Sequence, residues 1–264
     1  MGSAGFFGPD SVAWRVHADP SGIVSGIRSL MVQALQPRAM AAVAQHSDFR
    51  VDFWGRLQRT SDFLFTVVYG TTSDAERVSA RVRSIHSQIS GIDDYTGLAY
   101  RADEPELLVW VHNATVESYL TGYRLYGRSL SAGEADRYVA EMRVLGMLMG
   151  LDESAVAQDV GDLNAYFVER APLLAAAPSA KEGVRRLLNP DLPLALKPLW
   201  TIPALAAVAS LPREYRSAFD LPWIAPLNPG VRVSTTALMS AFRLLLPPPP
   251  LVEEAMARTS PTPV

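Results

Sequence analysis

Apolar residues recur at intervals of three and four along most of the chain, and the strict alternation typical of half-buried strands is scarce. Capping residues, glycines and prolines divide this pattern into segments. The predicted helices cover residues 21–35, 37–46, 52–69, 73–90, 105–126 and 131–149. The pattern therefore predicts an all-α fold.

Helix starts and one break in the helical pattern add detail. Ser73 with Glu76, and Ser131 with Glu134, have the spacing of a capping box, in which the serine caps the first turn of a helix. Residues 91–103 lack helical spacing and predict a loop with a small hairpin. The segment over residues 105–126 is apolar around most of its circumference, which predicts a central buried helix.

Prolines divide the last third of the chain into shorter amphipathic helices, and no polar linker interrupts it. We therefore expect one globular domain over residues 1–246. The run Pro247–Pro250 predicts a polyproline-like segment that ends the compact part. Residues 247–264 are then expected to form a proline-rich tail.

Composition limits the classes of function. The chain has 264 residues, of which 48% are hydrophobic and 19% charged, so it can bury a large core and does not resemble a disordered protein. Its net charge of −3 argues against nucleic-acid binding, which usually needs a strongly basic surface. The basic residues are nearly all arginines, which suits the binding of carboxylates, although high-GC codon usage gives the same bias.

The chain contains no cysteine, which excludes disulfides, thiolate-bound haem, covalent c-type haem and thiol nucleophiles. Its first ten residues lack the charged and apolar regions of a secretory signal, so a cytoplasmic location is expected. Prolines and Lys197 interrupt the most apolar stretch, Leu192–Leu211, and a spanning helix needs about 20 apolar residues with few breaks. We expect no transmembrane segment, and contact with a membrane surface stays open.

Familiar catalytic signatures are missing from the sequence. There is no Glu-x-x-His pair of the kind found in di-iron bundles, and no His-Glu-x-x-His, Gly-x-Ser-x-Gly, P-loop or dinucleotide-binding glycine motif. Four histidines remain as candidates for metal or catalytic chemistry.

His86 is the most informative of these histidines. On the helix predicted over residues 73–90, it falls at the edge of the apolar face, where its imidazole could enter an interior pocket. A partly buried histidine bonded to a backbone carbonyl would fit the pattern equally well. The residues by themselves leave both interpretations open.

The other histidines lie in different contexts. His112 is expected to be buried in the central helix, as a partner of a metal ligand, a distal-pocket group or a hydrogen-bonded core residue. His46 precedes Ser47 at a predicted helix end. His17, followed by Ala18-Asp19-Pro20, is most simply a turn residue.

Arg56 and Thr60 are four residues apart on a predicted helix, so both side chains point toward the same neighbour. Such a pair is often only a solvated arginine beside a threonine. Arg59 lies close by, and Arg38 is a further source of positive charge.

These residues belong to an ordered series in the first third of the chain. The series is Gln36-Pro37-Arg38-Ala39-Met40, Gln45-His46-Ser47-Asp48-Phe49, Arg56-Leu57-Gln58-Arg59-Thr60, Tyr69-Gly70 and Ile85-His86-Ser87-Gln88-Ile89. In this order and spacing it resembles the catalytic domain shared by the fungal MpaB oxygenase and bacterial latex-clearing rubber oxygenases. The resemblance is clear over residues 6–151.

The resemblance implies a buried pocket for haem b, with His86 as the proximal iron ligand. It implies that Arg56, assisted by Arg59, supplies positive charge near the porphyrin or its propionates, and that Thr60 supplies a hydroxyl. His46 would organise the pocket wall. His112, which matches no quoted motif, is a further candidate to lie near the cofactor, with a core role as the alternative. The implied reaction is the cleavage of a carbon–carbon double bond in an apolar, isoprenoid- or lipid-like substrate by dioxygen.

One departure keeps alternatives open. Many relatives have His-Pro where this chain has Gln36-Pro37. A haem-binding or haem-sensing protein without turnover is therefore a second hypothesis. A cofactor-free helical interaction protein, docking through Leu192–Leu211, is a third.

Overall fold

The computed structural model describes residues 4–47, 50–223 and 225–259. Helices dominate these ranges, and their one sheet is a two-stranded hairpin. The helices are α1 (Val12–Ala18), α2 (Gly22–Gln33), α3 (Pro37–His46), α4 (Phe53–Tyr69), α5 (Thr72–His86), α6 (Pro105–Tyr126), α7 (Ala132–Leu148), α8 (Val160–Arg170), α9 (Pro178–Leu188), α10 (Lys197–Ser210), α11 (Arg213–Ala218), α12 (Asn228–Leu245) and α13 (Pro250–Thr259). The strands are β1 (Ser90–Ile92) and β2 (Ala99–Arg101), and short 3₁₀ helices cover Glu153–Ala155, Ala171–Leu173, Leu194–Leu196 and Ala225–Leu227.

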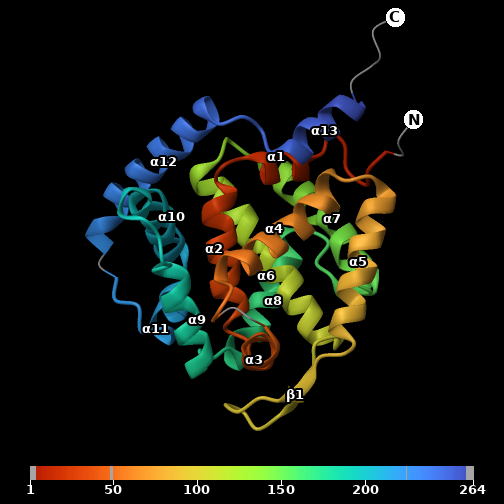
Figure 1. The fold of residues 1–264 in the computed structure, drawn as a ribbon, viewed down its shortest axis with the longest axis vertical. Coiled ribbons are helices and arrows are strands. Elements are labelled where there is room, and N and C mark those ends of the chain that lie inside the picture. Colours follow the sequence, from red (N-terminus) through yellow and green to blue (C-terminus); the bar gives the residue numbers. More distant parts are fainter. Residues whose placement is uncertain (1–3, 48–49, 224, 260–264) are drawn as a thin grey trace, which may run out of the picture.

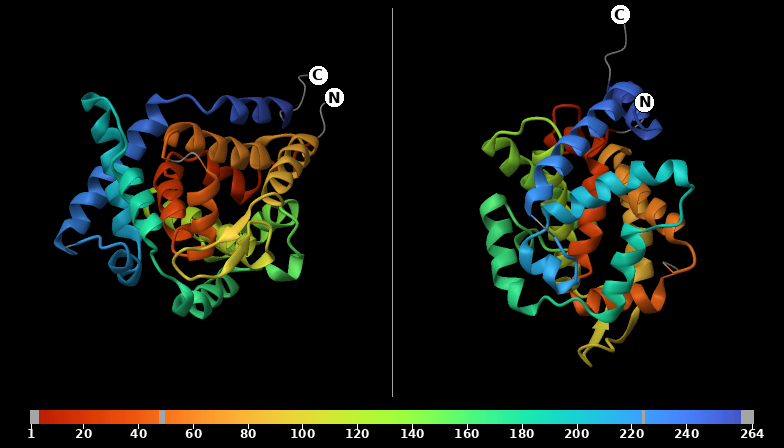
Figure 2. Two further views of the ribbon diagram at one scale, coloured as in Figure 1. Left: turned by 60° about the horizontal axis from the view of Figure 1, so that its bottom comes forward. Right: turned by 90° about the vertical axis from the view of Figure 1, so that its left-hand side faces the viewer.

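Helices α2 and α6 pack against each other at the centre of a single domain (Figure 1). Helices α10 and α12 lie on one side of this pair, and α5 and α7 lie on the other (Figures 1 and 2). More than half of α6 is buried, including Trp110 and Tyr123, because its apolar residues encircle the helix. The predicted all-α, single-domain fold and the central helix are thus confirmed.

The start of α5 differs from the prediction. Thr71, not Ser73, caps the helix, and Asp74 takes the place expected of Glu76 in the capping box. This capping box fits the general rule, since the side chain of the acidic residue at the third helical position accepts a hydrogen bond from the backbone N–H of the capping residue. The prediction for α7 is confirmed, with Ser131 and Glu134 forming its box.

The expected hairpin follows α5 directly. Ser90 pairs with Arg101 and Ile92 with Ala99, and Gly97 occupies a left-handed conformation with φ of 73° in the connecting turn. Because α5 ends at His86 rather than at Ser90, the candidate iron ligand lies in the last turn of its helix.

The proline run does not end the compact part of the chain. Pro250 starts α13, whose Val252 and Ala255 are buried in the core beside α4. The expectation that residues 247–264 form a tail outside the compact domain was wrong. Pro250 is the first residue of a helix, where its missing N–H removes no helical hydrogen bond.

The most apolar stretch, Leu192–Leu211, is largely helix α10. Its second half packs against α2 and α12, with Ala206, Ala207 and Val208 buried. The second half of this stretch is therefore part of the core, whereas its first half, including Leu194 at 80% exposed, lies on the surface. Within the described ranges, no helix combines the length and apolar character needed to cross a membrane.

Candidate functional site

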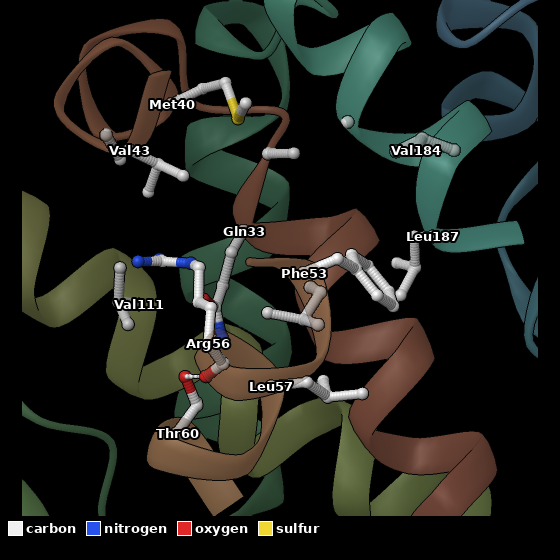
Figure 3. Close-up of a pocket in the computed structure, with 14 residues that line it drawn as sticks. Gln33, Met40, Val43, Phe53, Arg56, Leu57, Thr60, Val111, Val184 and Leu187 are labelled. Atoms are coloured by element: carbon white, nitrogen blue, oxygen red, sulfur yellow. Dashed lines mark hydrogen bonds between the residues drawn. The ribbon is translucent and has the colours of Figure 1, made fainter. Parts of the chain in front are cut away.

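Helix α4 carries Arg56 and Thr60 on one face of a small pocket. The pocket has a volume of about 110 Å³ and lies between α2, α3, α4 and α9, with Val111 of α6 at its side (Figure 3). The Thr60 hydroxyl donates a hydrogen bond of 3.0 Å to the Arg56 carbonyl oxygen, which fixes its rotamer along the helix. Apolar side chains such as Met40 and Phe53 make up most of the lining. The pocket is therefore mainly apolar and contains one positively charged side chain, that of Arg56.

The Arg56 guanidinium is half-buried and has no acidic partner in the described part of the chain. Its side chain extends from α4 toward Val111 (Figure 3). Burial, with a smaller contribution from the charge of Arg59, lowers its pKa. A desolvated and unpaired cation is unfavourable by itself, so this position suits a bound anion, which would form charge-assisted hydrogen bonds with it.

His86 lies within electrostatic range of Arg56. Burial is the main reason for the lowered pKa of His86, the carboxylate of Asp103 opposes this shift, and the charge of Arg56 adds to it. The ring is half-buried, and its Nδ1 is buried without a hydrogen-bond partner. The neutral form, which binds metals, is therefore the favoured one.

The buried face of α5 differs slightly from the predicted apolar face. Ala75 and Ser79 are fully buried, whereas Ile85 is 48% exposed. His86 follows Ser79 by seven residues, two helical turns, so it lies on the inner face rather than at its edge. The carbonyl-bonded alternative finds no support, because neither ring nitrogen has a hydrogen-bond partner among the described residues.

Two further arginines are already paired. Arg59 is exposed and forms an ion pair of 3.0 Å with Asp52. Arg38 is bound by Glu104 at 2.7 Å and by Glu106 at 2.8 Å. Of these cations, Arg56 is the one left available to a ligand.

Gln36 has a role in the fold. Its side-chain oxygen accepts hydrogen bonds from the backbone N–H groups of Arg38 at 2.7 Å and Ala39 at 3.2 Å, so it caps α3. The part of the neighbouring motif formed by Asp48 and Phe49 lies outside the described residues.

His46 and His112 are not brought into the Arg56 pocket. His46 is exposed at the end of α3 and donates a hydrogen bond of 3.1 Å to the Ser90 carbonyl oxygen, so it links α3 to β1. His112 faces α7, where a Cβ atom at Gly146 would lie 3.6 Å from its Nδ1. Burial lowers the pKa of His112 to about 4.

Aromatic residues on and near these helices occupy several places. Phe53 lines the Arg56 pocket, while Trp54 is 40% exposed and packs edge-on against Trp200, which lines a second, larger cavity. Trp110 is buried and donates to the Gln33 carbonyl oxygen at 3.0 Å. Tyr119 also lines this larger cavity.

That larger cavity, which we call the chamber, was not predicted from the sequence. It has a volume of about 860 Å³ and lies between α1, α2, α4, α6 and the segment over residues 242–256. Leu30, Gln33, Leu57 and Thr60 line both the chamber and the Arg56 pocket, so the two spaces adjoin. A signal was present in the glycines at positions 22 and 26, which remove side chains from one face of α2.

His17 also lines the chamber, and its expected place in a turn was wrong. It is 2% exposed within α1, its Nε2 lies 3.1 Å from the Tyr138 hydroxyl, and its ring stacks on Tyr119 with centroids 4.3 Å apart. Burial lowers its pKa to about 3. The turn signal of Asp19-Pro20 acts after His17, since α1 continues through Ala18.

Comparison with known proteins assigns the chain to a family. A family model described as "ER-bound oxygenase mpaB/B'/Rubber oxygenase, catalytic domain" matches residues 14–244. The chain belongs to this family. The match includes the Arg56 pocket, His86 and the larger part of the chamber lining.

A solved structure supports the fold of this mpaB/rubber oxygenase domain. The latex clearing protein LCP, in a structure of its closed state, superposes with a TM-score of 0.63 and 17% sequence identity. The similarity covers 94% of this chain and 72% of that chain. No curated protein sequence matches significantly.

Proposed function

We propose that this oxygenase-family domain binds haem b through His86 and uses dioxygen to oxidise an apolar, unsaturated molecule of isoprenoid or lipid type. Family membership supports the class of oxygenase. The observation that carries the proposal is the pair formed by an unpaired, half-buried Arg56 and a half-buried His86 with an unpartnered Nδ1.

The chemistry of the side chains suits a haem group, although the Arg56 pocket of about 110 Å³ is smaller than a haem and His86 is not among its lining residues. Among the described residues, no three or more histidine, aspartate or glutamate side chains gather where they could hold a metal ion. A haem iron needs only one or two protein ligands, because the porphyrin supplies the others, and one neutral histidine is a common choice. The Arg56 cation matches the carboxylate of a propionate.

Each residue then has a defined task. His86 would hold the iron, Arg56 would bind and orient a propionate, and Thr60 would place its hydroxyl beside the macrocycle. Arg59, which can exchange its exposed partner Asp52, would add positive charge at the pocket edge. His46 would brace the wall formed by α3, and His112 would contribute from the core beside α7. Haem, when bound, supplies the redox-active iron at which dioxygen reacts.

The apolar lining of the pocket favours an apolar substrate and limits the access of water. Oxidative cleavage converts one carbon–carbon double bond and one dioxygen molecule into two carbonyl groups. Both oxygen atoms enter the products, and no external electron donor is required. A cytoplasmic location belongs to the same proposal.

An absorption spectrum tests the cofactor. We expect a Soret band when the protein is supplied with haem, and its loss in His86→Ala. The His46→Ala variant is the comparison: it removes a histidine that braces the wall through its bond to Ser90 but is no iron ligand, so the band should be retained. A wild-type protein that stays colourless would disprove the proposal.

A haem protein without turnover is the second candidate, favoured by one observation. Gln36 stands where many relatives have histidine, and its side chain is used as a helix cap. Oxygen uptake with an unsaturated isoprenoid separates the two candidates. Uptake supports an oxygenase, whereas a Soret band without uptake supports a haem-binding or sensing role.

A further inference from the structure

The chamber has the dimensions of a binding site for an extended molecule. It follows α2 from Gly22 to Gln33, a distance of about 16 Å at the helical rise. Most of its lining is apolar, including Ile27, Leu64 and Phe65. Ligand sites typically combine such a lining with a few polar groups that fix orientation.

The charged groups on the chamber lining are mostly compensated within the protein. Arg243 pairs with Asp19 at 2.7 Å, and Arg15 pairs with Glu134. Arg128 is exposed at the rim, where water solvates its charge. The interior therefore does not need a charged ligand.

Two polar groups on the chamber lining are not compensated. His17 Nδ1 is buried and has no hydrogen-bond partner. The Tyr119 hydroxyl also has no partner in the described part of the chain, and Tyr119 is only 8% exposed. A buried polar atom without a partner, such as His17 Nδ1, is uncommon and costly, and the Tyr119 hydroxyl, which is not itself buried, belongs to the ring stacked on His17.

The hydrogen bond to Tyr138 decides what His17 offers to a ligand. Tyr138 is fully buried, and His17 Nε2 is the partner of its hydroxyl among the described residues. The phenol proton is satisfied only if Tyr138 donates to Nε2, which leaves the ring proton on Nδ1. His17 Nδ1–H and Tyr119 O–H are then both donors, and their common complement is a neutral oxygen acceptor.

Space for the ligand is created by α2. Gly22 and Gly26 are four residues apart, so they lie on one face of the helix, and both line the chamber. A Cβ atom at Gly26 would meet the Tyr119 hydroxyl oxygen at 3.7 Å, an ordinary contact distance. A larger side chain at this position would therefore occupy the chamber without straining the backbone.

We propose that the chamber binds an apolar chain that ends in a neutral hydroxyl or carbonyl oxygen, with this oxygen bonded by His17 and Tyr119. The chain would run along α2 toward Leu57 and Thr60, which line both the chamber and the Arg56 pocket. Figure 3 shows these two residues on the pocket side. The identification of this molecule as the oxidised substrate rests on the proposed function, whereas its binding does not.

Binding is tested with simple probes and purified protein without haem. Decanol, decanoate and undecane are compared by their displacement of the fluorescent dye Nile red. We expect decanol to bind about tenfold more tightly than undecane, as two neutral hydrogen bonds allow. Equal binding of decanol and undecane, or tighter binding of decanoate, would overturn the proposal.

Substitutions locate the site. Tyr119→Phe removes a hydroxyl that bonds to no described residue, so the fold is expected to persist while the preference for decanol falls several-fold. Tyr138→Phe removes the hydrogen bond that places the ring proton on His17 Nδ1, so it should also lower the preference for decanol. If Tyr119→Phe keeps the full preference, the assignment of the donor is wrong.

Filling the chamber gives a second test. Gly26→Leu should abolish binding of all three probes, and Gly133→Leu, at an exposed position of α7 with open space around it, is the matched control. Undiminished binding in Gly26→Leu would place the probes elsewhere. The His86→Ala variant should bind decanol normally, so failure of the chamber proposal and failure of the haem proposal give different results.

Discussion

At the scale of single residues, the domain keeps polar groups in positions that its own fold leaves unsatisfied. Arg56 is a partly desolvated cation without an acidic partner. His17, His86 and His112 each have a buried Nδ1 atom without a hydrogen-bond partner. Such groups cost stability, and proteins usually retain them for function. These groups therefore lower the stability of the folded protein and leave polar atoms to which a ligand can bind.

Substitution of Arg56 tests both the binding of haem and the stability of the haem-free protein. We expect Arg56→Gln to weaken haem binding by roughly tenfold or more, because a charge-assisted bond to a propionate contributes about 1.5–3 kcal/mol. The same change should leave the haem-free protein equally stable or more stable, since it removes a desolvated charge. Haem titration and urea unfolding measure the two effects.

Arg59→Gln is the matched control, because Arg59 is exposed and already paired with Asp52. Its effect on haem affinity should be no more than about twofold, as expected of a surface ion pair. A larger loss in Arg59→Gln than in Arg56→Gln would contradict the assignment of roles.

Buried histidines make stability depend on pH. The pKa values of His17 and His112 in the folded protein are about 3 and about 4, below the value of about 6.5 in an unfolded chain. Below pH 6.5 the unfolded chain gains protons that the folded chain does not, so stability is complete above pH 6.5 and falls with acidification. At pH 5 each histidine should cost about 2 kcal/mol relative to pH 7.

Urea unfolding at pH 7 and pH 5 measures this cost. In His112→Gln the difference in the free energy of unfolding between the two pH values should shrink by about 2 kcal/mol. An unchanged difference would mean that His112 is protonated in the folded state, or that its surroundings compensate the charge.

At the scale of elements, helix starts decide where the candidate ligands lie. Thr71 and Asp74 cap α5, and the helix then ends at His86. Gln36 caps α3 through its side-chain oxygen. The capping residues thus help to determine where α3 and α5 begin, and so where their side chains lie.

We expect Thr71→Ala to destabilise the protein by about 1 kcal/mol, since it removes the side chain that satisfies the first turn of α5. Ser73→Ala, one position inside the helix and exposed, should have a much smaller effect. Midpoints of urea unfolding compare the two variants. Equal effects would argue against the observed start of α5.

At the scale of the whole molecule, segments distant in sequence pack against each other in one domain. Helix α13 packs against α4, about 190 residues earlier, and Arg258 donates to the Tyr69 carbonyl oxygen. The segment over residues 242–256 also lines the chamber. The end of the described chain therefore contributes both to the core and to the proposed binding site.

This contribution can be measured at Val252, which is 4% exposed. Val252→Ala should lower the free energy of unfolding by about 1–3 kcal/mol, because it removes buried methyl groups and leaves a cavity. Glu254→Ala, on the exposed side of α13, should change it by less than about 0.5 kcal/mol. A Val252→Ala variant as stable as wild type would show that α13 is not part of the core in solution.

Local patterns in the sequence determined most of the secondary structure. The helical spacing, the box of Ser131 and Glu134, and the loop after α5 depend on neighbouring residues, so they could be predicted without tertiary contacts. The ordered series around Arg56 and His86 likewise indicated the family. Errors arose where neighbouring signals competed, as between Thr71 and Ser73, or where a turn signal acted later than expected, as after His17.

Only the tertiary structure decided which polar groups are paired and which spaces are open. The sequence offers Arg38, Arg56 and Arg59 as sources of positive charge, and the folded chain gives carboxylate partners to Arg38 and Arg59 but leaves the half-buried Arg56 without one. The chamber likewise forms where glycines of α2 meet Tyr119 of α6 and a segment more than 200 residues away. Burial, pairing and cavity volume depend on contacts between distant segments, and the sequence does not state these contacts.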